Sequence, residues 1–310
     1  MGYFLIVLTV GVSLTQTTLQ KIYSNRHGNG GFLFTAFLSL FSFLFLLGRY
    51  IITDDCKTDF TMELLPYALA GAFCYCVASV ASYLAYQTGP YGITGLIFSF
   101  SILITSIFGI IMFDEPYTIW TFVGFGLIIV SLVLVYPPKK NTKEQEKPEK
   151  NDTAEKAKEK TDKISVKWII AVIVNLILSP AYGILTRFQQ KKFNDTVTNE
   201  FIMIAIGLSA IILFVVGFAT AKKESKNIVK TSFPYASTAG VANGLTNILT
   251  AALYMLLPIS IQAPTTSVMS KVASFVIAYY VFKERFILRQ IIGIFVGVFA
   301  VVLINVATII

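Results

Sequence analysis

Long apolar segments, separated by short polar ones, recur along the whole chain. Ten windows stand out, at residues 3–23, 32–52, 64–87, 91–113, 117–136, 166–190, 200–220, 233–257, 260–282 and 286–309. A helix of roughly 20 residues crosses the hydrocarbon core of a bilayer, and these runs are too long and too continuous for the strands of a membrane barrel. The pattern therefore predicts an all-α membrane protein with ten transmembrane helices.

Polar residues inside the windows follow a helical spacing, and the pattern of the first five windows returns in the second five. The first and sixth windows match at an offset of 166 positions, with Thr9, Ser13, Gln16 and Gln20 followed by Asn175, Ser179, Tyr182 and Thr186. The third and eighth windows match at an offset of 168, with Tyr75, Ser79, Ser82 and Tyr86 followed by Asn243, Asn247, Thr250 and Tyr254. Residues spaced i, i+4, i+7 and i+11 share one helix face, so each stripe marks one face. The window at 32–52 carries no such stripe, and we expect it to lie outside the polar site.

Two matching sets of five windows define the domain organisation. Residues 1–136 form the first five-helix repeat, residues 137–165 a charged, flexible linker, and residues 166–310 the second five-helix repeat. Because five crossings is an odd number, the second copy runs through the membrane in the opposite sense, as in many secondary transporters. The linker is rich in Lys and Glu and cannot bury a core of its own.

Composition agrees with a membrane protein and narrows the range of partners. Apolar residues make up 55% of the chain and the mean hydropathy is +0.71, so the bilayer is the solvent for most of it. The net charge of +8 is spread over loops, which favours contact with anionic lipid head groups over nucleic acid. We expect no metal and no cofactor, since Cys74 and Cys76 point to different faces of a helix.

Lys271 is the most informative single residue about the substrate, because it lies in the middle of the window at 260–282. Its side chain is too short to reach either interface from there, and Ser267 and Ser274 share its face of the helix. No Asp or Glu occupies the middle of any window, so the natural counter-ion is the substrate. We therefore expect an anionic or zwitterionic substrate that bears a carboxylate or a phosphate. The alternative is a lysine kept neutral by burial.

Other stripe residues are candidates for binding the same substrate. An amide side chain is costly to bury without a hydrogen-bond partner. The candidate amides are Gln16, Gln20, Asn243 and Asn247. Three tyrosines line the wall of the site or anchor their helices at the membrane interface. These are Tyr86, Tyr182 and Tyr254. For the Ser and Thr members, helix packing is the alternative role. Lys21 and Arg187, near the ends of their windows, either attract anions or anchor their helices at the interface.

Two corner motifs complete the pattern. Phe113-Asp114-Glu115 leads to Gly124, and Phe282-Lys283-Glu284 leads to Gly293, at an offset of 169. Together with the ten windows, these motifs resemble the EamA-type transporters of the drug/metabolite transporter superfamily. The resemblance implies an exporter or exchanger of small metabolites, with a central cavity enclosed by the first, third, fourth, sixth, eighth and ninth spans. Lys271 is similar to the basic residue that faces phosphate in the triose-phosphate branch.

These features predict a secondary transporter, an exchanger or facilitator that works by alternating access on a small anionic or zwitterionic organic metabolite. A membrane-embedded enzyme needs a catalytic set at membrane depth, and the one histidine, His27, lies in a loop. A non-transporting scaffold or receptor of the same fold is the alternative function.

We expect an integral, multi-pass protein of the plasma membrane, present as a monomer or homodimer. Lys and Arg crowd the linker and the loops on the same side, so the positive-inside rule places that side in the cytoplasm and both termini outside. The family resemblance instead places both termini in the cytoplasm.

Overall fold

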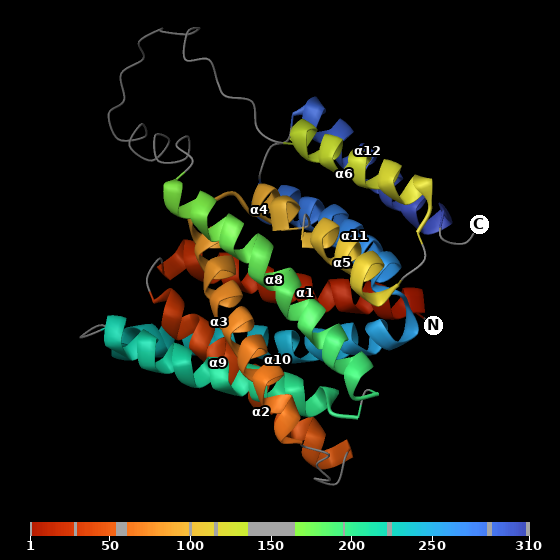
Figure 1. Cartoon of the computed structure of the whole chain (residues 1–310). Coiled ribbons are helices and arrows are strands. Elements are labelled where there is room, and N and C mark those ends of the chain that lie inside the picture. The colour runs from red at the N-terminus through yellow and green to blue at the C-terminus, as the bar shows by residue number, and fades with distance from the viewer. Residues whose placement is uncertain are drawn as a thin grey trace, which may run out of the picture.

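The computed structural model describes residues 2–27, 30–53, 61–98, 101–114, 117–135, 165–194, 196–221, 225–283 and 287–307. Every regular element in these ranges is a helix (Figure 1). The first half contains α1 (Gly2–His27), α2 (Gly31–Thr53), the short 3-10 helix η1 (Met62–Leu64), α3 (Leu65–Thr88), α4 (Tyr91–Phe98), α5 (Ser101–Phe113) and α6 (Ile119–Val135). The second half contains α8 (Val166–Lys192), α9 (Thr198–Ala221), α10 (Ser225–Leu256), α11 (Ile259–Tyr280) and α12 (Leu288–Ala307).

The apolar windows and the helices agree closely, and the predicted all-helical fold is confirmed for the described residues. Six described helices are long and apolar enough to cross a membrane: Gly2–His27, Gly31–Ile52, Met62–Thr88, Val166–Lys192, Thr198–Thr220 and Asn227–Leu256. The window at 91–113 holds two helices, α4 and α5, on either side of residues outside the described ranges. The predicted linker at 137–165 also lies outside the described residues, apart from Ser165.

Helix ends fall where the local sequence demands them. Gly89 and Pro90 follow the last residue of α3, and Pro258 precedes the first residue of α11. Proline disfavours helical geometry in the residue before it and suits the start of a helix. The corner residues Asp114 and Lys283 both adopt the left-handed conformation, with φ of 52° and 54°. Asp114 directly follows α5, and Lys283 lies three residues after Tyr280, the last residue of α11.

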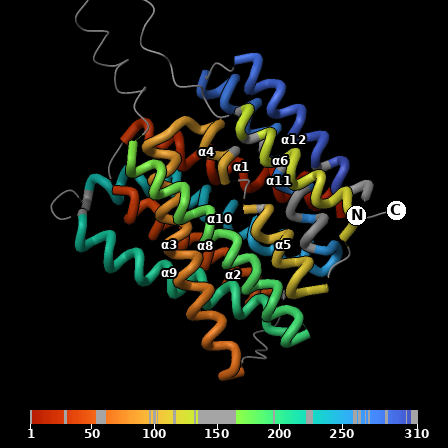
Figure 2. The backbone as a smooth tube through the Cα atoms, turned by 45° about the horizontal axis from the view of Figure 1, so that its top comes forward, coloured from red at the N-terminus to blue at the C-terminus, as the bar shows by residue number. Residues whose placement is uncertain are grey.

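The helices pack in a pattern that alternates between the two halves of the chain. The most extensive contacts of α3 are with α8 and α9, whereas those of α10 are with α1 and α2. Helices α2 and α9 also pack along each other. Helices α6 and α12 form a pair at the edge of the molecule and contact mainly each other, as Figures 1 and 2 show. The two halves are therefore interleaved rather than separate bodies.

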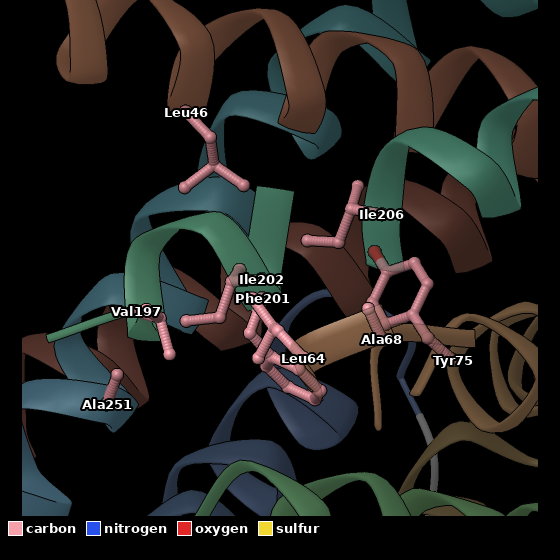
Figure 3. Close-up of a cluster of buried hydrophobic side chains, with 9 residues drawn as sticks. All are labelled: Leu46, Leu64, Ala68, Tyr75, Val197, Phe201, Ile202, Ile206 and Ala251. Carbon is pink, nitrogen blue, oxygen red and sulfur yellow. The ribbon is translucent and has the colours of Figure 1, made fainter. Parts of the chain in front are cut away.

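A cluster of buried apolar side chains joins the helices on the α9 side (Figure 3). Its members come from α2, η1, α3, α9, α10 and the turn before α9, and are Leu46, Leu64, Ala68, Tyr75, Val197, Phe201, Ile202, Ile206 and Ala251. Phe201, fully buried, sits against Gly71 of α3, where a Cβ atom would lie 2.9 Å from the phenyl ring. The ring takes the space that the missing side chain leaves.

Helices α2 and α10 approach each other even more closely. A Cβ atom on Gly240 would lie 2.5 Å from the carbonyl oxygen of Leu38, and one on Gly244 would lie 3.1 Å from that of Ser42. Small residues allow such backbone contact in membrane proteins, where apolar side chains gain nothing by leaving lipid. The spacing of the two glycines thus sets how near α10 comes to α2.

Gly240→Ala should destabilise the protein by about 1–3 kcal/mol, the usual cost of overpacking, because the new methyl group would meet backbone rather than a movable side chain. Gly126→Ala is the matched control, since an added Cβ there meets nothing within 4 Å. Thermal unfolding of both variants in detergent measures the difference. Equal melting temperatures for the two variants would show that α2 and α10 do not touch as described.

Candidate functional site

The side chain of Asn243, in α10, connects three neighbouring helices through one polar network. Its Oδ1 atom accepts hydrogen bonds from the Tyr75 hydroxyl of α3 at 2.5 Å and from the Ser42 hydroxyl of α2 at 3.0 Å. Its Nδ2 atom donates to Oε1 of Gln16 in α1, also at 3.0 Å. Asn247, one turn further along α10, donates to the same Oδ1 at 3.2 Å. The network therefore brings together three of the predicted site residues, Gln16, Asn243 and Asn247.

Helix α8 joins this network through an aromatic contact. The rings of Tyr75 and Tyr182 lie 5.4 Å apart between centroids, in a tilted arrangement. The buried hydroxyl of Tyr182 finds no hydrogen-bond partner in the described part of the chain. A buried hydroxyl normally has a partner, so this group is available to a bound molecule or a water.

A second polar group surrounds the start of α4. The Tyr91 hydroxyl hydrogen-bonds the hydroxyls of Thr17 at 2.9 Å and Thr18 at 3.2 Å, both in α1. The ring of Tyr86 packs on that of Tyr91, with centroids 5.3 Å apart. Ser274 of α11 lies beside this group, since a Cβ atom on Gly95 would approach both its hydroxyl and that of Tyr86 within 4 Å. The structure thus places Tyr86 and Ser274 together, next to α1.

The remaining predicted site residues are placed less centrally. The side chain of Gln20, 1% exposed, has an Oε1 atom that finds no hydrogen-bond partner among the described residues. The ring of Tyr254 is buried against Phe113, at the far end of α10. Ser267 is half-buried in α11. Lys271 belongs to α11 by its backbone, but its side chain lies outside the described part of the structure.

Basic residues near the site contact helix ends. Nζ of Lys21 donates to the carbonyl oxygens of Tyr86 at 2.8 Å and Gly89 at 2.7 Å. Arg187 donates through its guanidinium to the carbonyl oxygen of Tyr254. Lys191 donates to the carbonyl oxygen of Phe113, the last residue of α5, at 2.9 Å. Helix C-termini carry unpaired carbonyls and a partial negative charge, so these cations neutralise them.

Two members of the network were not predicted as site residues. Tyr75 lies on a predicted stripe, and it occupies the position that corresponds to Asn243 at the offset of 168. Ser42 comes from the window at 32–52, and the prediction that this window stays outside the polar site is wrong for Ser42. The signal for it was in the partner helix, where Gly240 and Gly244 lie four residues apart and allow close contact.

The network is built from uncharged polar groups. Its described members are neutral amides and hydroxyls, which donate and accept hydrogen bonds but do not titrate near neutral pH. The described residues hold no group of three or more His, Cys, Asp or Glu side chains that is placed to bind a metal ion.

Comparison with protein families decides the class of protein. The model of the EamA-like transporter family matches residues 1–136, which span α1 to α6. Residues 1–136 belong to the EamA-like transporter family. The resemblance to the drug/metabolite transporter superfamily is confirmed, because the EamA family is part of it. The chain is an integral, multi-pass membrane protein, with six described helices long and apolar enough to cross a membrane.

Solved structures extend the likeness to the whole chain. One crystal structure of a protein aligns over 96% of this chain and 97% of its own, with a TM-score of 0.56 and 11% sequence identity. It is one of 27 chains of solved structures that match. At this identity the similarity shows the fold alone. No curated protein sequence matches the chain.

Two tyrosines in ring contact allow a matched test of the network. Tyr75→Phe removes a hydroxyl that donates to Asn243, and should lower the free energy of unfolding by about 0.5–1.5 kcal/mol. Tyr182→Phe removes a hydroxyl without a partner in the described structure, and should leave unfolding unchanged. Thermal melts in detergent, without added solutes, compare the two. A Tyr182→Phe variant that melts as low as Tyr75→Phe would contradict the assigned network.

Proposed function

We propose that the protein is a secondary carrier that moves a small anionic or zwitterionic organic metabolite across the membrane by alternating access. Its ten spans form two inverted five-helix repeats, residues 1–136 and 166–310, and the polar network and Lys271 bind the substrate between them. The carrier is an exchanger or facilitator. The observation that carries this proposal is that residues at corresponding positions of the two halves contact each other in reciprocal pairs.

The hydrogen bond between Tyr75 and Asn243 is the clearest such pair. These residues lie 168 positions apart, the offset that relates the stripes of the third and eighth windows. A residue contacts its own counterpart only near a two-fold axis that relates the halves. The flanking contacts follow the same rule, since Gln16 contacts Asn243 while its counterpart, Tyr182, contacts Tyr75. Inverted repeats produce this arrangement around a binding site at the midplane.

The peripheral helices α6 and α12 support the same relation. A Cβ atom on Gly124 would lie 3.1 Å from the carbonyl oxygen of Ala300, and the Ser131 hydroxyl donates to the carbonyl oxygen of Gly293 at 2.6 Å. Gly124 corresponds to Gly293, and Ser131 to Ala300, at the offset of 169. The corners before these helices also correspond, with Asp114 and Lys283 both left-handed.

The substrate charge is inferred from the acids as well as from Lys271. The described carboxylates, Glu63, Asp114 and Glu200, belong to η1, to the corner after α5 and to the first turn of α9. The helices that carry the network therefore offer no described carboxylate at mid-depth. This distribution supports a substrate that itself brings the negative charge, and it favours exchange or facilitated diffusion over coupling through a membrane carboxylate.

Counterflow in proteoliposomes tests the proposal directly. Vesicles loaded with unlabelled solute would be offered labelled amino acids, organic acids, sugar phosphates and nucleotide sugars. We expect saturable exchange of an anionic or zwitterionic member of this panel. Exchange of neutral or cationic solutes alone would contradict the substrate class, and absence of exchange would favour a non-transporting scaffold or receptor.

Lys271→Met should reduce this exchange to the background of empty vesicles without unfolding the protein, because the substrate would lose its counter-ion. Lys230→Met is the matched control, since Lys230 is exposed near the start of α10. Size-exclusion profiles and melting temperatures establish that both variants are folded. Undiminished exchange by folded Lys271→Met protein would remove the lysine from the site.

A further inference from the structure

Lys21 and Arg187 make the same contact in the two halves of the chain. Lys21, 9% exposed, donates to the carbonyl oxygen of Tyr86, and Arg187 donates to that of Tyr254. The two cations lie 166 positions apart and the two tyrosines 168 positions apart, which are the offsets of the respective windows. Each half thus carries one cation that ties its first helix to the C-terminus of its third.

Each contact holds a corner of the chain as well as a helix end. Lys21 also binds the carbonyl oxygen of Gly89, between α3 and α4. Tyr254 lies in the last turn of α10, just before Pro258 and α11. Carbonyls of a last helical turn have no intrahelical partner. The cation is therefore a specific partner of its corner.

The two contacts lie toward opposite ends of the molecule. Lys21 is in the C-terminal part of α1, and Arg187 is in the C-terminal part of α8. Figure 1 shows α1 running away from the N label toward the left of the view, whereas α8 runs from the upper left to the lower right. The C-terminal parts of the two helices thus point to opposite sides.

We propose that Lys21 and Arg187 are the two latches of the transport cycle: Lys21 holds the α3–α4 corner closed at one end, Arg187 holds the α10–α11 corner closed at the other, and the ends open in turn. The inference rests on the proposed alternating-access function. Both residues act on helix corners and not on substrate, so they are positioning residues. Closing one end while opening the other requires that only one corner be released at a time.

The packing around the α3–α4 corner shows which contacts must break when this corner is released. Tyr91, directly after the corner, bonds Thr17 and Thr18 of α1, so three side chains of α1 hold the same corner. Trp168, at the start of α8, fills the space beside Gly89, where a Cβ atom would lie 2.1 Å from its Nε1 atom. Opening this end therefore moves the corner away from both α1 and α8 as a unit.

Hydrogen–deuterium exchange of the full-length protein in lipid nanodiscs tests the latches. We expect Lys21→Met to raise exchange at residues 86–94 by at least about tenfold, the factor for losing a hydrogen bond to a charged group. Because the ends alternate, the same variant should lower exchange at residues 254–262. Arg187→Met should produce the opposite pattern, with exchange raised at 254–262 and lowered at 86–94. The lowered exchange at the distant corner is the decisive reading, because a merely structural contact would loosen only its own surroundings.

Arg289→Met is the matched control. Arg289 also donates to a carbonyl near a helix C-terminus, that of Val133 at 2.7 Å, but on the peripheral pair α6 and α12. It should leave exchange at both corners unchanged. Lys21→Arg should restore the wild-type pattern, and Lys21→Gln provides a second neutral variant if the Met variant does not fold.

The possible results separate this inference from the transport proposal. Exchange raised only at the corner that lost its cation, or raised at both corners, would overturn the latches. A reciprocal pattern in Arg289→Met would overturn them as well. Counterflow by the wild-type protein tests the transport proposal independently. If the protein transports but shows no reciprocal change in exchange at the two corners, the proposed function stands and only the latch proposal is overturned.

Discussion

The backbone carbonyls at helix ends impose the constraint on which this structure depends. A helix leaves its last four carbonyls without intrahelical partners. Four helices meet this demand with basic side chains from a neighbouring helix, through Lys21 to Tyr86, Arg187 to Tyr254, Lys191 to Phe113 and Arg289 to Val133. The attraction between a cation and the negative end of the helix dipole adds to each bond. Each of these four bonds joins the end of one helix to a neighbouring helix.

The polar network depends in turn on how closely the helices approach. Ser42 reaches Asn243 because Gly244, one residue further along α10, lets the backbones of α2 and α10 come together. Once the helices are that close, an amide on α10 satisfies hydroxyls from two helices and an amide from a third. Polar groups buried together in this way fix one register of packing, since a slipped helix would leave several of them unpaired. Under the proposed function, the same groups recognise a polar solute.

Local periodicity predicted the helices and part of the polar network. The remaining features depend on contacts between helices far apart in the sequence, which periodicity does not reveal. The helices and the stripe residues Gln16, Asn243 and Asn247 follow from spacing within one segment, which the sequence displays directly. Ser42 was missed because its own window shows no sign of the contact, which depends on Asn243 of α10, 201 positions away. The hydrogen-bond partners of Lys21 could not be read from the sequence either. A basic residue near a helix end can anchor the helix at the membrane interface or bind a carbonyl oxygen of another helix.

Differences between the two halves are as informative as their likeness. Under the proposed repeat, Gly89 corresponds to Leu257 and Trp168 to Gly2. Gly89 makes room for Trp168, and Gly2 makes room for Leu257, whose Cδ1 atom would lie 3.3 Å from a Cβ atom there. Each contact therefore pairs a glycine with a large side chain. In one contact the large residue, Trp168, belongs to the first helix of its half, and in the other the large residue, Leu257, follows the third helix of its half. Under the proposed alternating access, each end thus keeps one large side chain with which to close against α1 or α8.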